Sequence, residues 1–276
     1  MKTNRFIALA LSISLTISGS SAALGQAKET LTVPLSDPAK PGSLKVNLLN
    51  GSIRISGYAG KEVVIEATGK AAEQNDRPKD ENAAGMRRIV PSSGLELTAT
   101  EEQNSIKVSS RFVNKAMNLH IKVPQKFTVK ATTVNDGDII VENVDGELEI
   151  ANVNGDITLS SVSGSAVANT INGTLKATFK TVDAKSPMAF STLNGNVDVT
   201  LPATAKFDVK LKSDRGEIYS DFDVDVDKSQ PQATRTSKEG MFKVSLEDWV
   251  KGQVNGGGSE IMMKNMNGNI YVRKAK

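Results

Sequence analysis

Short stretches in which apolar and polar residues alternate cover much of the chain. Leu44, Val46 and Leu48 are separated by polar residues, and residues 119–123 repeat the arrangement. Alternation of this kind puts the apolar side chains on one face of a β-strand, whereas an amphipathic helix repeats them about every 3.6 residues. Patterns typical of helices are nearly absent, so the sequence predicts an all-β protein.

Glycine marks a nine-residue period in the middle of the chain, at Gly137, Gly146, Gly155, Gly164 and Gly173. Apolar residues follow nearly every one of these glycines at the second, fourth and seventh positions, and the seventh positions are Val144, Val153, Val162 and Ile171. Because a unit of one strand and one bend buries only one face, it must stack on copies of itself. The repeats over residues 137–180 therefore predict a single-stranded β-solenoid, a stack like a parallel β-helix, with Val153 in its core.

The repeat continues at a longer spacing toward the end of the chain. Residues 188–195 match residues 166–173 position for position, and the next corner glycine, Gly216, follows 21 residues later. Coils of about 18–22 residues, stacked at about 4.8 Å, account for these spacings. We therefore expect residues 137–216 to form a short rod of about four coils, and the corner and strand at residues 268–272 to be one more copy.

The first 27 residues have the pattern of a secretory signal peptide. A basic start and an apolar run over residues 6–17 precede small residues, which place the cleavage point after Ala27 or after Gly25. The apolar run is shorter than the roughly 20 residues that a membrane-spanning helix needs. We expect an exported protein, periplasmic or extracellular, with one β-strand-repeat domain over residues 28–273.

Composition limits the chemistry that this chain can perform. Its 276 residues include no cysteine and one histidine, which excludes disulfides, thiolate zinc sites, cysteine nucleophiles and a lipid anchor attached at a cysteine. The formal net charge of +3 is too small for a general nucleic-acid-binding protein. A polar segment over residues 70–88 carries charges of alternating sign, which indicates a solvated loop, with room for a short helix near residues 82–88.

Several short motifs occur together over residues 44–273. An Asn-Gly-Ser-Ile segment at residues 50–57 is followed by a strand at 62–65, and a further strand ends in Lys-Val-Pro at 122–124. Corners of the Asn-Gly-Asp-Ile type follow, and the last is Asn-Gly-Asn-Ile at residues 267–270. As a set they resemble domain-of-unknown-function family 4097, the adhesin-labelled β-strand-repeat proteins of bacteria. The resemblance implies an exported β-solenoid whose first hairpin joins the first two of these segments. It implies no catalytic residues, and it leaves the polar segment unexplained.

Nine-residue glycine repeats also occur in calcium-binding β-rolls, which place an aspartate in each repeat. Here an acidic residue follows the corner glycine at Asp138, Glu147 and Asp156, but Ser165 and Thr174 take its place in the next two repeats. The missing carboxylates would leave Ca²⁺ short of its usual roughly 6–8 oxygen ligands. The pattern therefore favours plain corner glycines, and no metal or cofactor is predicted.

Other candidate side chains fit a structural role better than a chemical one. The single histidine, His120, lies between two apolar residues, so it points outward and lacks a placed partner for general-base chemistry. Recurring corner asparagines are expected to stack as an amide ladder or to hold the turns, at Asn154, Asn172 and Asn194. A run of alternating aspartates could form a cation-binding ridge, but it better fits a strand with an acidic outer face, Asp221, Asp223, Asp225 and Asp227, and an inner face of Phe222, Val224 and Val226.

Aromatic residues that could stack on sugars are few and scattered along the sequence, at Tyr58, Tyr219, Tyr271 and Trp249. Trp249 belongs to the least repetitive segment, residues 239–258, which we expect to cap the open end of the solenoid. An enzyme on a β-helix would need acidic and basic side chains together across adjacent coils. The nearest candidates, whose spacing does not predict stacking in register, are Asp138, Asp156, Lys176 and Asp198.

The leading hypothesis is an exported, non-catalytic β-solenoid of the cell envelope or surface with an adhesin-like interaction or structural role. Its sheet faces, rather than a pocket, would bind glycans or surface proteins. Two alternatives remain open: a polysaccharide lyase or hydrolase on a β-helix, and an accessory protein of envelope stress signalling. The sequence leaves the ligand, the handedness of the solenoid and the oligomeric state open.

Overall fold

The computed structural model describes residues 26–70, 97–110, 116–135, 137–227, 233–238, 241–246 and 249–276. The predicted signal peptide, up to residue 25, and the polar segment from residue 71 to residue 88 lie outside the described residues. Every regular element that the described residues form is a β-strand, as the alternating pattern predicts.

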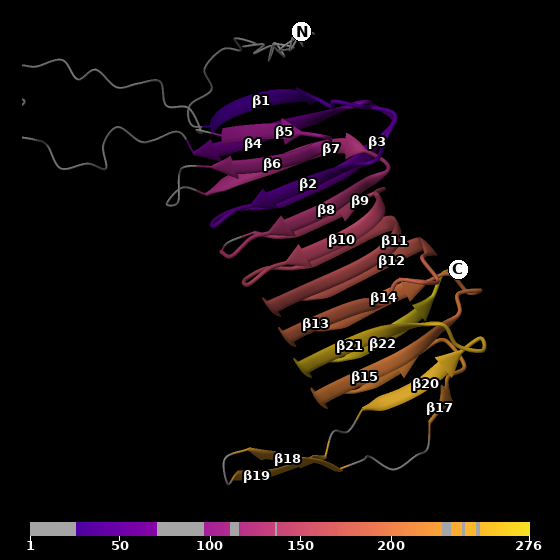
Figure 1. The fold of residues 1–276 in the computed structure, drawn as a ribbon. Coiled ribbons are helices and arrows are strands. Elements are labelled where there is room, and N and C mark those ends of the chain that lie inside the picture. Colours follow the sequence, from indigo (N-terminus) through magenta and orange to yellow (C-terminus); the bar gives the residue numbers. More distant parts are fainter. Residues whose placement is uncertain are drawn as a thin grey trace, which may run out of the picture.

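Most strands form two sheets that pack face to face as a β-solenoid (Figure 1). Sheet I contains, in spatial order, β5 (Leu97–Glu102), β6 (Ser105–Ser110), β2 (Gly42–Asn47), β8 (Phe127–Thr132), β10 (Asp145–Ala151), the second half of β11 (Ile157–Asn172), β13 (Met188–Asn194), β21 (Ser259–Asn267), β15 (Phe207–Arg215), β20 (Val250–Val254) and β17 (Asp225–Val226).

Sheet II contains, in spatial order, β1 (Gln26–Pro34), β4 (Glu62–Lys70), β7 (Met117–Pro124), β3 (Ile53–Tyr58), β9 (Ile139–Glu142), the first half of β11, β12 (Leu175–Val182), β14 (Val197–Leu201), β22 (Ile270–Lys274) and β16 (Ile218–Ser220). The strand β11 passes from one sheet to the other, so the two sheets are continuous along the chain. A separate hairpin pairs β18 (Ala233–Lys238) with β19 (Met241–Leu246).

Each central coil contributes one strand to each sheet and pairs in parallel with its neighbours. Gly146 pairs with Gly164 in sheet I, and Ile157 pairs with Leu175 in sheet II. The apolar residues of the alternating pattern point between the sheets, where Leu148 and Ile157 are 0% exposed. Burying a side chain of this size stabilises the fold by about 1.5–3 kcal/mol. Stacking of coils thus supplies the core that a single coil lacks, and the predicted solenoid is confirmed.

The order of the coils in space differs from their order in the sequence at both ends. The coil of β2 and β3 lies between β6–β7 and β8–β9. The last coil of the chain, β21 and β22, lies between β13–β14 and β15–β16. The expected rod over residues 137–216 is therefore interrupted, because the C-terminal coil separates Gly195 from Gly216. Parallel strand edges offer equivalent hydrogen bonds, so the repeat pattern alone does not decide which coil comes next.

The N-terminal region contains antiparallel pairs, but its strands pair differently from the predicted first hairpin. The strand β7 lies between β3 and β4, parallel to the first and antiparallel to the second. The hairpin of this region is instead β5–β6, which turns through Gln103 and Asn104 with φ values of 52° and 62°. Two consecutive positive φ angles are typical of the turns that match the twist of a hairpin.

The C-terminal end of the solenoid is capped, as the sequence predicts. The strand β20 pairs antiparallel with the outer edge of β15, and β17 pairs with β20 in turn. The ring of Trp249 lies beside β15, with Lys210 Nζ at 4.8 Å from its centroid. An antiparallel strand at the end of a parallel stack pairs backbone groups that would otherwise form an open edge.

Val153 is not a core residue, which corrects the sequence prediction. Val144 and Val162 are 1% and 0% exposed, but Val153 is half-buried and Ile171 is 44% exposed. The two corners of a coil differ, so the structural period is the whole coil rather than nine residues. At the corner that contains Val153, the side chain that points inward belongs to Asn152, which is 2% exposed.

Candidate binding surfaces

Polar side chains, all but one of them buried, hold the corner at the end of six neighbouring strands of sheet I. Thr170 Oγ1 donates to the carbonyl oxygen of Gly155 at 3.0 Å, and Asn152 Nδ2 donates to that of Gly137 at 2.9 Å. The same bond recurs along the solenoid from Thr133 to Gly51, Thr192 to Gly173, Asn265 to Gly195 and Ser213 to Gly268. Each coil is therefore tied to the corner of its neighbour by a hydrogen bond that also satisfies a buried polar group.

Asparagine side chains form a ladder along the same corner, as predicted for Asn154, Asn172 and Asn194. Asn172 Nδ2 donates to Asn154 Oδ1, and Asn194 Nδ2 donates to Asn172 Oδ1, both at 2.8 Å. The ladder extends over further coils through Asn50, Asn135, Asn267 and Arg215. These amides bond to one another, so their role is to join coils.

One aliphatic side chain per coil stands on the outer surface beside this amide ladder. Each immediately precedes a ladder asparagine, and the set in spatial order, here called the aliphatic row, is Leu49, Val134, Val153, Ile171, Leu193 and Met266. Ile171 and Leu193 are each 44% exposed. At the spacing of stacked strands, six coils make a row roughly 24 Å long. Contiguous exposed apolar surface of this kind is typical of interaction sites.

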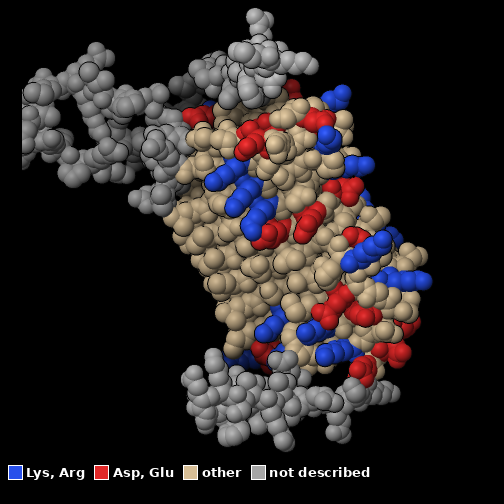
Figure 2. Space-filling view, in the orientation of Figure 1, with Lys and Arg blue, Asp and Glu red and all other residues tan. Residues whose placement is uncertain are grey.

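The aliphatic row borders an uncharged band in the middle of sheet I. Val167, Ala189 and Met262 are neighbours in register on β11, β13 and β21. Asn169 and Ser191 form the next line of the band, between these residues and the row. Figure 2 shows the result, since charged side chains gather toward the two ends and the right-hand side of the view and leave an uncharged area in the middle and on the left.

The structure brings together two aromatic residues that are far apart in the sequence. Tyr219 of β16 and Tyr271 of β22 are Cα partners on the outer face of sheet II. Their rings stack with centroids 5.4 Å apart and an interplanar angle of 11°. The expectation of scattered aromatic residues is therefore wrong for this pair, because β22 inserts next to β16. Similarity between residues 216–219 and 268–271 is the sequence signal that could have revealed it.

The candidate charges for a lyase are partly in register. Lys176 and Asp198 are Cα partners on β12 and β14, which corrects the expectation that they do not stack. Asp198 Oδ1 accepts a hydrogen bond from Arg273 Nε at 2.8 Å, and this bond raises the pKa of Arg273 above its usual value. Asp198 is thus held in an ion pair with a residue of the C-terminal coil.

The acidic corner residues Asp138 and Asp156 serve the backbone of the adjacent coil. Asp138 Oδ1 accepts from the backbone N–H of Asp156 at 2.8 Å, and Asp156 Oδ1 accepts from that of Thr174 at 2.7 Å. In the part of the chain that the structure describes, no group of three or more histidine or acidic side chains is placed to hold a metal ion. Each of these two corner carboxylates therefore accepts a hydrogen bond from the backbone of the adjacent coil.

His120 points outward from β7, as the alternation predicts, and it has a partner that the sequence did not indicate. Its Nε2 atom lies 3.3 Å from Ser56 Oγ, on the neighbouring strand β3. The cross-strand neighbour Glu66 is paired with Lys28 and Lys122 at 3.3 and 3.5 Å. Partial burial opposes ionisation of Glu66, but the two lysines outweigh it and hold its pKa below the usual value. The carboxylate is thus engaged by lysines.

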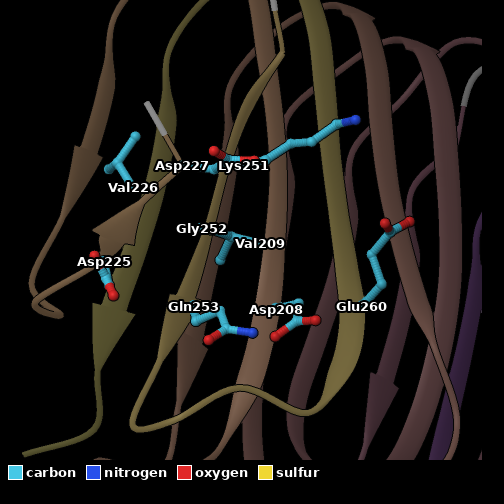
Figure 3. Close-up of a pocket in the computed structure, with 9 residues that line it drawn as sticks. All are labelled: Asp208, Val209, Asp225, Val226, Asp227, Lys251, Gly252, Gln253 and Glu260. Atoms are coloured by element: carbon cyan, nitrogen blue, oxygen red, sulfur yellow. The ribbon is translucent and has the colours of Figure 1, made fainter. Parts of the chain in front are cut away.

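A cavity of about 400 Å³ opens at the capped end, between β15, β17, β20 and β21 (Figure 3). Its lining includes four acidic side chains and Lys251, and the acidic residues are Asp208, Asp225, Asp227 and Glu260. Figure 3 shows these carboxylates spread around the opening rather than directed at one point. Their distribution does not match the convergent oxygen ligands that a bound cation needs.

The run of alternating aspartates shows the predicted exposure for most of its length, but the predicted strand is wrong for residues 221–224, because β17 covers only Asp225–Val226. All four aspartates are exposed, Phe222 is 5% exposed in the core, and Val224 packs against the core. Val226 departs from the prediction, since it is 42% exposed. The strand β17 is only two residues long, and Val226 at its end lies outside the core in which Phe222 is buried.

Comparison with known proteins identifies the family. The model of the Toastrack DUF4097 family matches residues 14–255, so the chain belongs to this family. The resemblance found in the sequence is confirmed. No curated protein matches the chain in sequence.

Solved structures of similar architecture have low sequence identity to this chain. A candidate cell adhesion protein from Clostridium sporogenes is 13% identical, with a TM-score of 0.42 over 91% of this chain and 100% of that chain. A candidate adhesin from Bacteroides fragilis is 12% identical, with a TM-score of 0.41 over 90% of this chain and 97% of that chain. Among the described residues, no helix is both long and apolar enough to cross a membrane.

Proposed function

We propose that the protein is a non-catalytic interaction protein of the cell envelope or surface, and that it binds a protein partner through the outer face of sheet I. The observation that carries this proposal is the uncharged band with its aliphatic row. Ile171 and Leu193, which lie in the middle of the aliphatic row, are each 44% exposed to solvent. Covering exposed aliphatic side chains releases their hydration water, which favours association.

The shape and charge of this surface support a broad contact with a protein rather than a small-molecule site. Small ligands bind in concave pockets, whereas the band lies on the outer face of a sheet. Protein interfaces combine an apolar centre with a polar rim. The band has this arrangement, because Glu149 and Lys130 lie on one side of it and Lys264 and Lys210 on the other.

Export is part of the proposal and rests on the pattern of residues 1–27. Cleavage after Gly25 would leave the whole of β1, which begins at Gln26, and cleavage after Ala27 would remove its first two residues. Both products keep the central pairs of β1 with β4, such as Leu31 with Ile65. The proposed mature chain therefore retains its edge strand.

The proposal is tested by binding of the purified chain from residue 28 onward to whole bacterial cells and to isolated envelope fractions. We expect saturable binding that weakens about tenfold in the double variant Ile171→Ser and Leu193→Ser, since buried anchors dominate interface energies. Val226→Ser is the matched control, because Val226 has a similar exposed fraction, 42%, but lies on β17 away from the band. Absence of binding to cells and envelope fractions alike, or equal binding by the double variant, would contradict the proposal.

A further inference from the structure

We propose that the stacked tyrosines on sheet II are the centre of a binding site for a neutral polysaccharide. The site comprises Tyr219 and Tyr271 with the adjacent side chains of Arg273, Asp198 and Lys176, and is here called the tyrosine platform. This inference rests on the proposed function in that it assigns a second ligand, a carbohydrate, to an exported binding protein. It concerns the opposite face of the solenoid from the aliphatic row.

The geometry leaves one aromatic face open to a ligand. Tyr271 is covered on both sides, by the ring of Tyr219 at 5.4 Å and by the guanidinium of Arg273 at 4.8 Å from its centroid. Tyr219 is 52% exposed and lies on β16, the last strand of sheet II. Because the two rings are nearly parallel, the face of Tyr219 turned away from Tyr271 points past the end of the sheet. An exposed, flat aromatic face is the feature that pyranose rings bind.

The platform is rigid before a ligand arrives. Asn269 Nδ2 donates a hydrogen bond to the hydroxyl oxygen of Tyr271 at 3.0 Å, and the stacked partner limits rotation of the Tyr219 ring. The negative face of an aromatic ring attracts the weakly positive C–H groups of a sugar, as it attracts other positive edges. A ring already held in place loses little conformational entropy on binding. The arrangement therefore favours stacking of a sugar on Tyr219.

Polar side chains continue the platform along the solenoid. Lys176, Asp198, Tyr271 and Tyr219 occupy one line across four strands, β12, β14, β22 and β16. At the spacing of stacked strands, the line spans roughly 14 Å, which is long enough for several sugar units. Asp198 supplies carboxylate oxygens, and Arg273 has N–H donors besides the Nε–H that bonds to Asp198, so hydroxyl groups find both acceptors and donors. A chain of sugars that stacks one unit on the outer face of Tyr219 and turns over the ring edges would reach this line, whereas a single sugar would reach only the ring.

The charge of the platform distinguishes between neutral and acidic polysaccharides. Lys176 and Arg273 are balanced by Asp198 and by Asp221, which contributes to the raised pKa of Arg273. An acidic polysaccharide would be repelled by the carboxylates as well as attracted by the cations. Its binding would therefore gain little electrostatic free energy from a surface without net charge. The structure therefore points to a neutral chain of hexoses.

Affinity electrophoresis of the purified chain tests the inference. Native gels would contain hydroxyethylcellulose, laminarin or galactomannan as neutral probes, and alginate or polygalacturonate as acidic ones. We expect retardation by at least one neutral polysaccharide and by neither acidic one. Tyr219→Ala should weaken the association about tenfold, the magnitude of one lost aromatic contact with its buried area, whereas Tyr219→Phe should retain it because the ring face persists.

The matched control is Tyr58→Ala, which removes a half-buried tyrosine of sheet II at the other end of the solenoid. It should bind the neutral probe as the wild type does. Thermal melts establish that each variant is folded, and Tyr271→Ala provides a second test of the platform. Lack of retardation by all three neutral probes, preference for an acidic probe, or unchanged binding by a folded Tyr219→Ala variant would overturn the inference. Cell binding that is lost only in the sheet I double variant would leave the proposed function standing.

Discussion

At the scale of single residues, the corner glycines are required by the close approach of successive coils. A Cβ atom on Gly173 would lie 2.1 Å from the carbonyl oxygen of Gly155, and one on Gly195 would lie 2.1 Å from that of Gly173. The opposing atoms belong to the backbone, so they cannot move aside as the end of a flexible side chain can. Periodic glycine therefore marks the points where the backbone of one coil passes directly over the next.

Replacement of a corner glycine by alanine tests this requirement. Gly173→Ala should lower the free energy of unfolding by about 3 kcal/mol, because two coils must separate to admit the methyl group. Gly256→Ala is the control, since a Cβ there meets nothing within 4 Å and only its φ of 89° opposes the change. That control should cost about 1 kcal/mol. Chemical denaturation measures both, and equal losses would refute the steric explanation.

At the scale of a strand and its corner, the two halves of a coil have different roles. One corner buries an aliphatic residue, as at Val144 and Val162. The other buries a polar residue, as at Asn152 and Thr170, and turns the aliphatic residue that follows it into the solvent. The hydrogen bond from the buried polar side chain to a glycine carbonyl secures the second corner. The aliphatic residue at this corner is therefore not needed for the core, and it forms part of the aliphatic row on the outer surface.

Equivalent substitutions at the two corners should therefore differ in their effects. Val162→Asp places a carboxylate at a position that is 0% exposed, where an unpaired charge costs several kcal/mol, so we expect loss of cooperative folding. Val153→Asp places the same carboxylate at a half-buried outer position and should leave a cooperative thermal transition. Circular dichroism melts of the two variants make the comparison. Loss of folding in both, or in neither, would be inconsistent with two distinct corners.

At the scale of the whole molecule, two coils lie inside a coil that stands between them in the sequence. The coil of β2 and β3 lies inside β6–β7, and the coil of β21 and β22 lies inside β15–β16. The C-terminal coil completes the amide ladder, since Asn267 bonds to Asn194 on one side and to Arg215 on the other. Its strand β21 provides the parallel partner for all of β15 from Phe207 to Arg215. The end of the solenoid is thus assembled only when the last residues of the chain have been placed.

Removal of the C-terminal coil should destabilise the strands that lie beyond it in the stack, β15, β16 and β20. Truncation after Gly258 deletes β21 and β22, which separate β13–β14 from β15–β16. We expect β15 and β20 to lose protection from amide hydrogen exchange, while β10 and β12 keep it, because local stability follows local contacts. Removal of Lys276 alone, an exposed residue, is the control. Unchanged protection of β15 in the truncated chain would show that the stack can close without its last coil.

Similarities between repeats carry more information about coil order than their spacing does. Residues 265–268, Asn-Met-Asn-Gly, match the inner corner residues 152–155, Asn-Val-Asn-Gly. Residues 213–216, Ser-Asp-Arg-Gly, depart from that motif and form the corner of the outermost coil. A corner inside the stack continues the amide ladder on both sides, whereas a corner at its end does not. This difference was readable in the sequence, although the spacing of glycines did not reveal it.

Alternating polarity and the glycine period determined the strands, the corners and the solenoid, because strand faces and backbone clearance depend on residues close together in the chain. Only the tertiary structure decided which coils are neighbours, since parallel strand edges of similar coils present equivalent hydrogen-bonding groups. That choice placed Met266 next to Leu193 in the aliphatic row and Tyr219 against Tyr271. Both candidate binding surfaces thus arise from contacts between coils, which no single repeat contains.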